Sequence, residues 1–199
     1  MFIETAPTPN PQSLKFLPGQ AVLGEGQLGL DFPTPGTAKA SPLATALYDV
    51  DGVTGVYLGA DFVTVTKDAS VEWHDIKPAL LGTIADYLAA GIPVVDTGTM
   101  AGPAGGSAPS GKDLDDYTGE DREVVEQIID LLDTRVRPAV AQDGGDITFH
   151  EYTPGDGVVY LSLRGACAGC PSSTMTLKSG IENLLKHYVP EVHAVEAVG

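Results

Sequence analysis

The sequence is poor in basic residues and has no long apolar run. Lys and Arg together number 11 against 27 Asp and Glu, and the formal net charge over 199 residues is −16. Binding to nucleic acid or to an anionic membrane surface depends on clustered Lys and Arg side chains, so we expect neither partner. No stretch approaches the ~20 consecutive apolar residues that span a bilayer. These features predict a folded soluble protein and permit basic protein partners.

The first five residues also lack the features of a targeting segment. Residues 1–5 (MFIET) have neither the basic and apolar regions of a secretory signal nor the Arg-rich character of a transit peptide. We therefore expect a cytoplasmic protein of the bacterial type. A processed protein of the mitochondrial matrix would show the same features, and that alternative stays open.

Cysteine is scarce as well, with only Cys167 and Cys170 in the whole chain. Two cysteines cannot make the disulfide framework of a small secreted protein. In a reducing compartment, a pair separated by two residues points to metal binding or redox chemistry rather than to a structural disulfide.

A segment rich in small residues divides the chain. Residues 98–111 consist mainly of Gly, Ala, Pro and Ser, have no apolar periodicity and run into the acidic residues 113–116. Such composition is typical of a flexible linker. We predict an N-terminal domain at 1–97, a linker at 98–118 and a C-terminal domain at 119–199.

The N-terminal half predicts a small α+β domain. Short strands are expected at 2–5, 13–17, 53–58 and 62–66 because of their β-branched and aromatic content. Ser41 followed by Pro42 is typical of a helix N-cap and first turn. A second helix is expected from about 76 to 90, with Gly91 ending it.

The C-terminal half predicts a second α+β domain with the order α-β-β-α-β. Apolar residues recur at helical spacing over 119–141, and residues 143–146 (DGGD) end that helix. Strands are expected at 147–152, 158–164 and 192–198, with a helix at 171–188. Helices packed on one sheet face would form two layers.

The cysteine pair lies in a loop between a predicted strand and a predicted helix. Two intervening residues allow both sulfurs to converge on one centre, as in many Cys-ligated sites. Pro171 suits the first helical position, so free N–H groups at the helix start would lie beside Cys170 and favour its thiolate. We expect this loop to be exposed and its cysteines to act as ligands.

The number of ligands then predicts assembly. Structural zinc sites and common iron–sulfur clusters need about four protein ligands, whereas one chain offers two cysteines. None of the four His residues lies at short ligand spacing from the pair. The simplest completion is a two-fold dimer in which each chain contributes Cys167 and Cys170.

Residue chemistry alone leaves three interpretations of the pair. It could hold an iron–sulfur cluster or a structural zinc ion between two chains, act as a thiol–disulfide oxidoreductase, or have no chemical role. The redox interpretation is weakened because Ala166 precedes the first cysteine and Pro171 follows the second, unlike the thioredoxin pattern. Iron, acid-labile sulfide and visible absorption would separate these alternatives.

The cysteine pair belongs to a wider set of sequence blocks. In the C-terminal half the blocks are DGGD at 143–146, GACAGCPSS at 165–173 and TLKSGIE at 176–182. In the N-terminal half they are FIET at 2–5, TPNP at 8–11, LKFLPG at 14–19, SPLA at 41–44, GVTGV at 52–56 and DFVTVTK at 61–67. These blocks resemble the NifU and Nfu proteins, and the resemblance covers almost everything except the linker, in the same order along the chain.

This resemblance implies a carrier or late-acting scaffold rather than an enzyme. Members of the family hold a cluster, usually [4Fe–4S] with [2Fe–2S] as the alternative, between the Cys pairs of a homodimer. They receive it from an upstream donor scaffold and pass it to apo-proteins. Cys167 and Cys170 match the family's ligands, and the N-terminal domain is implied to recognise targets.

Three charged residues near the loop invite a functional interpretation. Asp143 and Asp146 could tune the site, but a role in capping the helix and shaping the turn is expected instead. Lys178 could contact an anionic cluster, but a solvated surface charge is expected.

Overall fold

The structure is a computed structural model that describes residues 2–24, 29–95, 112, 114–168 and 171–198, apart from the side chains of 171–174. The chain divides into two compact units, Met1–Ser107 and Ala108–Gly199. Each unit contains helices and its own sheet, which confirms the predicted α+β class. Residues 98–111 and 113 of the predicted linker lie outside the described residues.

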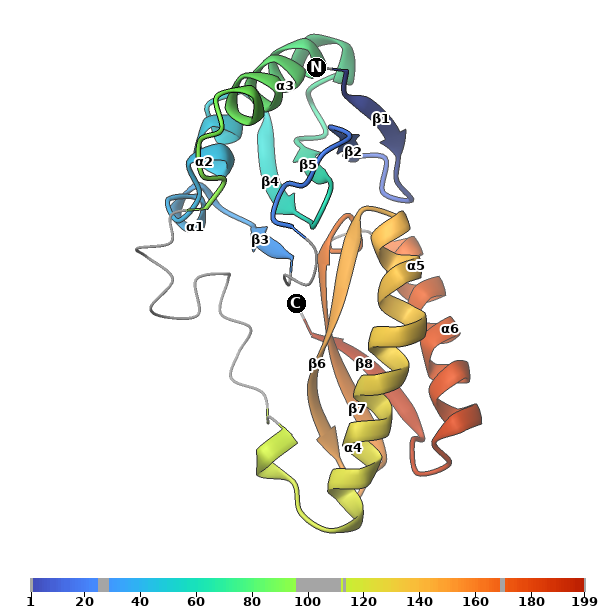
Figure 1. The fold of residues 1–199 in the computed structure, drawn as a ribbon. Helices are drawn as coiled ribbons and strands as arrows, with labels where there is room; N and C mark the ends of the chain where they lie inside the picture. The colour runs from blue at the N-terminus through green and yellow to red at the C-terminus, as the bar shows by residue number, and fades with distance from the viewer. Residues whose placement is uncertain (1, 25–28, 96–111, 113, 169–170, 199) are drawn as a thin grey trace. The chain divides into compact units, whose positions relative to one another are not determined.

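The N-terminal unit is built on an antiparallel sheet (Figure 1). Its strand order is β1-β2-β5-β4-β3. The strands are β1 (Glu4–Pro7), β2 (Ser13–Leu17), β3 (Leu30–Phe32), β4 (Val53–Leu58) and β5 (Val63–Lys67). The first strand begins two residues later than predicted, and the three-residue edge strand β3 was not expected. Strands β2, β4 and β5 lie where β-branched and aromatic residues predicted them.

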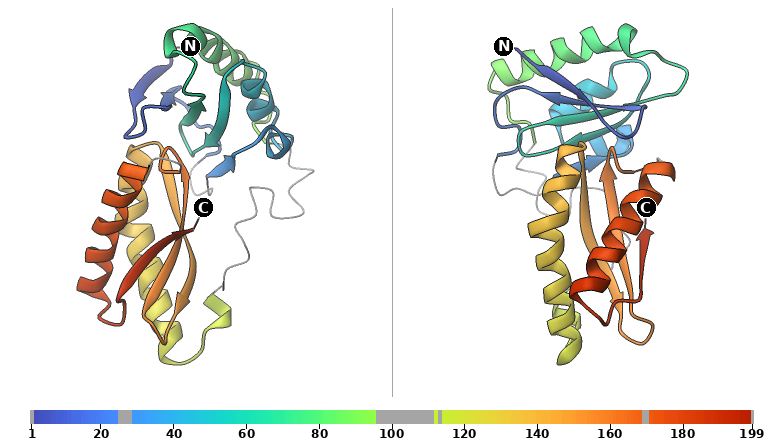
Figure 2. Two further views of the ribbon diagram at one scale, coloured as in Figure 1. Left: turned by 180° about the vertical axis from the view of Figure 1, so that it is seen from behind. Right: turned by 90° about the vertical axis from the view of Figure 1, so that its right-hand side faces the viewer.

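Helices α1 (Pro35–Ala38), α2 (Pro42–Tyr48) and α3 (Trp73–Ala89) complete the N-terminal unit (Figure 2). Ser41 caps α2 as predicted, since its side chain accepts a hydrogen bond from the Ala44 N–H. Helix α3 begins three residues earlier than predicted, and α1 was not expected. Apolar side chains from α2, α3 and the sheet form one core that includes Phe16, Leu47 and Leu80.

The C-terminal unit has the predicted order of helices and strands. Helix α4 (Glu120–Leu131) continues through the π-helical turn η2 (Leu132–Val136) into α5 (Arg137–Gln142). Strand β6 (Gly145–Thr153) pairs antiparallel with β7 (Val158–Gly165), and β7 pairs parallel with β8 (Ala194–Val198) after helix α6 (Pro171–Tyr188). The single helix predicted over 119–141 is therefore interrupted, and the last strand is two residues shorter than predicted.

The end of the predicted linker is attached to the C-terminal unit. Residues 114–116 form the short helix η1 (Leu114–Asp116), and the following Tyr117 is buried in the core. The Tyr117 hydroxyl donates to the carbonyl of Tyr152 and accepts from its N–H. Tyr117 therefore binds the backbone of β6 as a neighbouring strand would.

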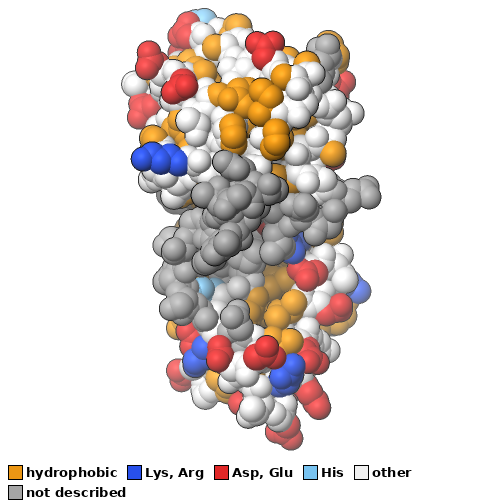
Figure 3. Space-filling model, turned by 60° about the vertical axis from the view of Figure 1, so that its left-hand side comes forward, with side chains coloured by type: hydrophobic (Ala, Val, Ile, Leu, Met, Phe, Trp, Pro, Cys, Tyr) orange, Lys and Arg blue, Asp and Glu red, His pale blue; other side chains and the backbone are white. Residues whose placement is uncertain are grey.

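The molecular surface reflects the acidic composition. Figure 3 shows acidic side chains distributed over the visible faces of both units, among apolar and uncharged groups. None of the described helices combines the length and the apolar character needed to cross a membrane.

Candidate metal centre

Cys167 lies in the short connection between β7 and α6. Gly165 ends β7 with a φ of 63°, a conformation that glycine adopts without strain. The Ala166 N–H donates to the Gly144 carbonyl over 3.2 Å, and the Ala168 N–H donates to the Gly165 carbonyl over 3.0 Å. The first bond attaches the cysteine loop to the turn that precedes β6, and the second closes a turn within the loop.

The Cys167 side chain packs directly against the start of β6. A Cβ atom placed on Gly145 would lie 2.6 Å from the Cys167 Sγ and 2.8 Å from the Arg164 carbonyl oxygen. Only glycine leaves room for the sulfur at this position. Cys167 is 7% exposed, so the expectation of an exposed loop is wrong at this residue. The sequence offered no periodicity in the loop from which burial could be inferred.

Burial also changes the acidity of Cys167. Loss of solvent and, to a smaller extent, the nearby carboxylates of Asp143 and Asp146 together raise the pKa of its thiol from 9.0 to about 11. The raised pKa therefore favours the protonated thiol of Cys167 at neutral pH. The favoured thiolate was predicted for Cys170, which lies outside the described residues.

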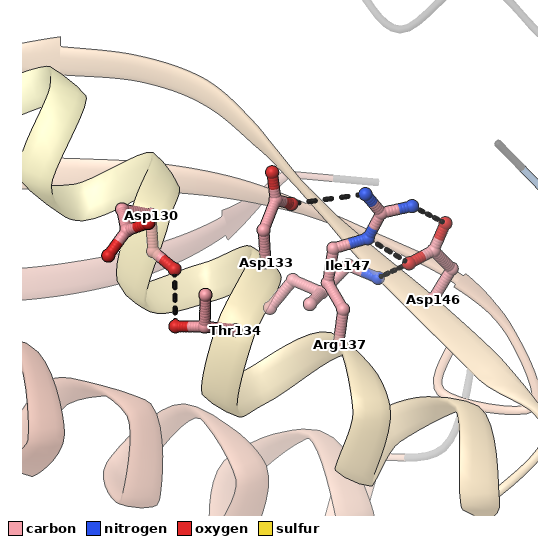
Figure 4. Close-up of polar contacts among 6 residues, drawn as sticks. All are labelled: Asp130, Asp133, Thr134, Arg137, Asp146 and Ile147. Carbon is pink, nitrogen blue, oxygen red and sulfur yellow. Dashed lines mark hydrogen bonds and ion pairs between the residues drawn. The ribbon is translucent and has the colours of Figure 1, made fainter. Parts of the chain in front are cut away.

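An ion pair between the partly buried Arg137 and the buried Asp146 lies at the start of β6, next to Gly145. Arg137 donates from Nε to Asp146 Oδ1 over 2.9 Å and from Nη2 to Asp146 Oδ2 over 3.1 Å, as Figure 4 shows. The Ile147 N–H also donates to Asp146 Oδ1, over 2.8 Å. The Arg137 Nη1 contacts Asp133 Oδ1 over 3.1 Å. Hydrogen bonding to Asp146 raises the pKa of Arg137, so the guanidinium stays charged.

This pair corrects the expected role of Asp146 and adds a residue that sequence reasoning missed. Asp146 neither caps the helix nor closes the turn; it ties α5 to β6 through Arg137. The turn itself depends on Gly144, whose φ is 78°. Arg137 and Asp146 are nine residues apart across a helix–strand turn, a separation that no helix or strand periodicity brings together.

The π-helical turn explains how Arg137 comes to lie at this position. Pro138 has no N–H group, so it cannot donate the i→i−4 hydrogen bond that an α-helix would place there. Over η2, immediately before Arg137, the backbone hydrogen bonds change from the α-helical i→i−4 pattern to the π-helical i→i−5 pattern. On the same segment the Thr134 hydroxyl donates to the Asp130 carbonyl over 2.6 Å (Figure 4).

The remaining predicted residues lie away from this pair or outside the description. Lys178 forms an ion pair with Glu196 over 2.8 Å, so it is more than the solvated charge that was expected. Among the described residues, no group of three or more His, Cys, Asp and Glu side chains could hold a metal ion. Cys170, the second predicted ligand, directly precedes α6 in the sequence.

Two domain families match the sequence. The family described as "Scaffold protein Nfu/NifU N terminal" matches residues 3–91, and the NifU-like domain family matches residues 128–196. The first match falls on the five-stranded unit, and the second includes the cysteine loop and the Arg137–Asp146 pair.

Curated relatives match along the whole chain. The human protein named "NFU1 iron-sulfur cluster scaffold homolog, mitochondrial" is 47% identical over 199 residues, which are 100% of this chain and 72% of the relative. A protein of the same name from Drosophila sechellia is 48% identical over 198 residues, and the chain spans 65% of its length. A solution structure described as a NifU-like protein from Saccharomyces cerevisiae aligns with a TM-score of 0.44 at 30% identity, over 49% of this chain and 86% of that one.

Proposed function

The chain belongs to the Nfu/NifU family of iron–sulfur cluster scaffold proteins, and from that premise we propose that it carries an iron–sulfur cluster between two copies of itself. The cluster is proposed to be [4Fe–4S], with [2Fe–2S] as the alternative. It is cargo that the protein transfers to apo-proteins, and the chain is not proposed to be an enzyme.

The cysteine count carries the proposal of a shared cluster. Each chain has only Cys167 and Cys170, and the common clusters need about four thiolate ligands. A two-fold axis beside the loop would bring both pairs together with the same geometry in each copy. Cys167 lies in the loop between β7 and α6, where its side chain is buried against the core of the C-terminal unit.

The chemistry of Cys167 fits cargo that arrives and leaves. Thiolate sulfur is the ligand that iron–sulfur clusters require. Burial holds Cys167 protonated without metal, so loading must release its proton and unloading must restore it. Protonation of the freed Cys167 thiolate lowers the net free-energy cost of transferring the cluster to a target whose thiolates are already available.

The N-terminal unit is proposed to recognise target proteins. Neither cysteine lies in this unit, so it has no thiolate with which to bind a cluster. The proposed partners are an upstream donor scaffold and apo-proteins that accept the cluster. The two curated relatives above are named as mitochondrial proteins, so the mitochondrial matrix and the cytoplasm are both proposed locations, which cell fractionation would separate.

Anaerobic reconstitution with iron and sulfide tests the function directly. The loaded protein should contain iron and acid-labile sulfide at about one cluster per two chains, as four-thiolate ligation requires. Sedimentation should give mainly monomer without cluster and dimer with it, because the cluster supplies much of the association free energy. A tight dimer without cluster would contradict this coupling. A loaded monomer would contradict the bridging arrangement.

The same experiment separates the alternatives. Zinc without sulfide would favour a structural Zn(Cys)4 dimer. Disulfide reductase activity of the metal-free protein would favour the redox function. Against the redox function, the raised pKa and burial of Cys167 make its sulfur a poor nucleophile at neutral pH.

A further inference from the structure

The Arg137–Asp146 pair has a structural position that the proposed function leaves unexplained. Asp146 is 5% exposed, and it directly follows Gly145, the residue against which the Cys167 sulfur packs. Leaving a carboxylate buried without a partner is strongly destabilising, so its charge must be balanced locally. Arg137 provides that balance with two hydrogen bonds.

The contacts fix the start of β6 from two sides. The forked guanidinium holds both Asp146 oxygens, which defines the angle of the carboxylate as well as its distance. The Ile147 N–H fixes Asp146 Oδ1 against its own strand. Asp133, one turn earlier on the helix, holds the opposite side of the guanidinium. Figure 4 shows these groups side by side between the helix and the strand.

The start of β6 is in turn attached to the cysteine loop. Gly145 pairs with Gly165 across the sheet, and the Ala166 N–H donates to the Gly144 carbonyl. A shift of residues 144–146 would therefore move both the loop backbone and the surface under the Cys167 sulfur. Side chains that orient a ligand in this indirect way typically change metal affinity by about 10- to 100-fold when removed.

Charge adds a second reason for the pair. A cluster held by four thiolates carries negative charge, and the Asp146 carboxylate would repel it if Arg137 were absent. We infer that Arg137, acting through Asp146, is a positioning residue that holds Cys167 in the geometry for cluster binding. This inference rests on the proposed function.

The test uses the full chain with three substitutions. Arg137→Met removes the charge and the fork, and Arg137→Lys keeps the charge without the fork. Arg122→Met is the matched control, because Arg122 on α4 forms exposed ion pairs with Asp115 of η1 and with Glu126 of α4. Amide hydrogen exchange of Ala166 in the metal-free protein measures loop position, with the Leu161 amide in mid-strand as an internal reference. Loss of cluster to a chelator measures retention.

We expect Ala166 to exchange at least about tenfold faster in Arg137→Met while Leu161 exchange is unchanged, and cluster loss to accelerate by about 10- to 100-fold. Arg137→Lys should fall between Arg137→Met and the unsubstituted chain, and Arg122→Met should match the unsubstituted chain in both measurements. If Arg137→Met does not fold, Arg137→Lys carries the test.

Three results would overturn the inference. Unchanged Ala166 exchange would show that the pair does not position the loop. Faster exchange at both Ala166 and Leu161 would show general destabilisation of the unit rather than a local effect on the loop. Faster exchange at Ala166 alone with normal cluster retention would show that the Arg137–Asp146 pair has no role in cluster binding. An unsubstituted chain that takes up no cluster would instead contradict the proposed function, and the Ala166 measurement alone would then decide whether the pair orders the loop.

Discussion

The N-terminal unit buries polar side chains that bind the backbone of neighbouring loops. Ser41 is fully buried; its hydroxyl donates to the Val94 carbonyl and caps α2. Lys67 is 6% exposed and donates to the Val71 carbonyl and to Gln12. In each case the polar group satisfies backbone or side-chain partners of the same unit, and none of these residues adjoins a cysteine.

The C-terminal unit buries a comparable polar group in a different setting. Asp146 is held by Arg137 and by the Ile147 N–H, one residue from the surface on which the Cys167 sulfur rests. The two units thus share a class of fold and a way of satisfying buried polar atoms. The difference is the neighbour, which is a loop in the first unit and the buried Cys167 thiol in the second. Both units therefore contain buried polar contacts, but the contact at Asp146 adjoins the candidate site.

The largest difference between the units is expected when a cysteine is removed. Cys167→Ser or Cys170→Ser should reduce cluster content to background, since a site with four thiolates loses two of them in the dimer. Iron and sulfide analysis after reconstitution measures this. Ser41→Ala in the N-terminal unit is the matched control and should retain the cluster. A normal cluster content in either cysteine variant would remove that residue from the ligands.

Thiol reactivity should differ strongly between Cys167 in the C-terminal unit and a cysteine introduced into the N-terminal unit. In metal-free Cys170→Ser protein, the pKa of Cys167 near 11 rather than 9.0 makes its thiolate about 100-fold rarer at neutral pH. Alkylation by iodoacetamide should therefore be slow at pH 7 and accelerate until about pH 11. A cysteine placed at the exposed Gln20 in a chain without Cys167 and Cys170 should react with a midpoint near 9. A Cys167 midpoint at or below 9 would contradict the buried thiol.

Glycine substitutions in the C-terminal unit separate a required glycine from a dispensable one. Gly145→Ala places a methyl group 2.6 Å from the Cys167 Sγ, and such overpacking costs about 1–3 kcal/mol. Gly180→Ala on α6 meets nothing within 4 Å and should stabilise the helix by up to about 1 kcal/mol. Urea unfolding followed by circular dichroism measures both, and Gly145→Ala should also lose cluster faster. Equal effects of the two substitutions would contradict the packing described here.

Local sequence signals predicted most of the fold and only part of the site. Apolar periodicity predicted the long helix over 119–141, and Ser41 with Pro42 predicted the start of α2, because these features depend on neighbours along the chain. The π-helical turn and the Arg137–Asp146 pair depend on contacts across a turn, which spacing does not encode. The burial of Cys167 depends on the missing side chain of Gly145, a relation visible only once β6 and β7 are paired.

The smallest expected effect tests whether the two units act separately. Ser41→Ala removes the cap of α2 and the bond to Val94, which should lower the stability of the N-terminal unit by about 1 kcal/mol. Trp73, the only tryptophan, lies in this unit, so its fluorescence should report the shifted unfolding transition. Gly145→Ala is the reciprocal control and should leave that transition unchanged.

Because each unit has its own core, Ser41→Ala should bind the cluster with normal stoichiometry and lose it to a chelator at the normal rate. Faster cluster loss in this variant would show that a change in the N-terminal unit reaches the cysteine loop, and the comparison of the two units would then have to include coupling between them.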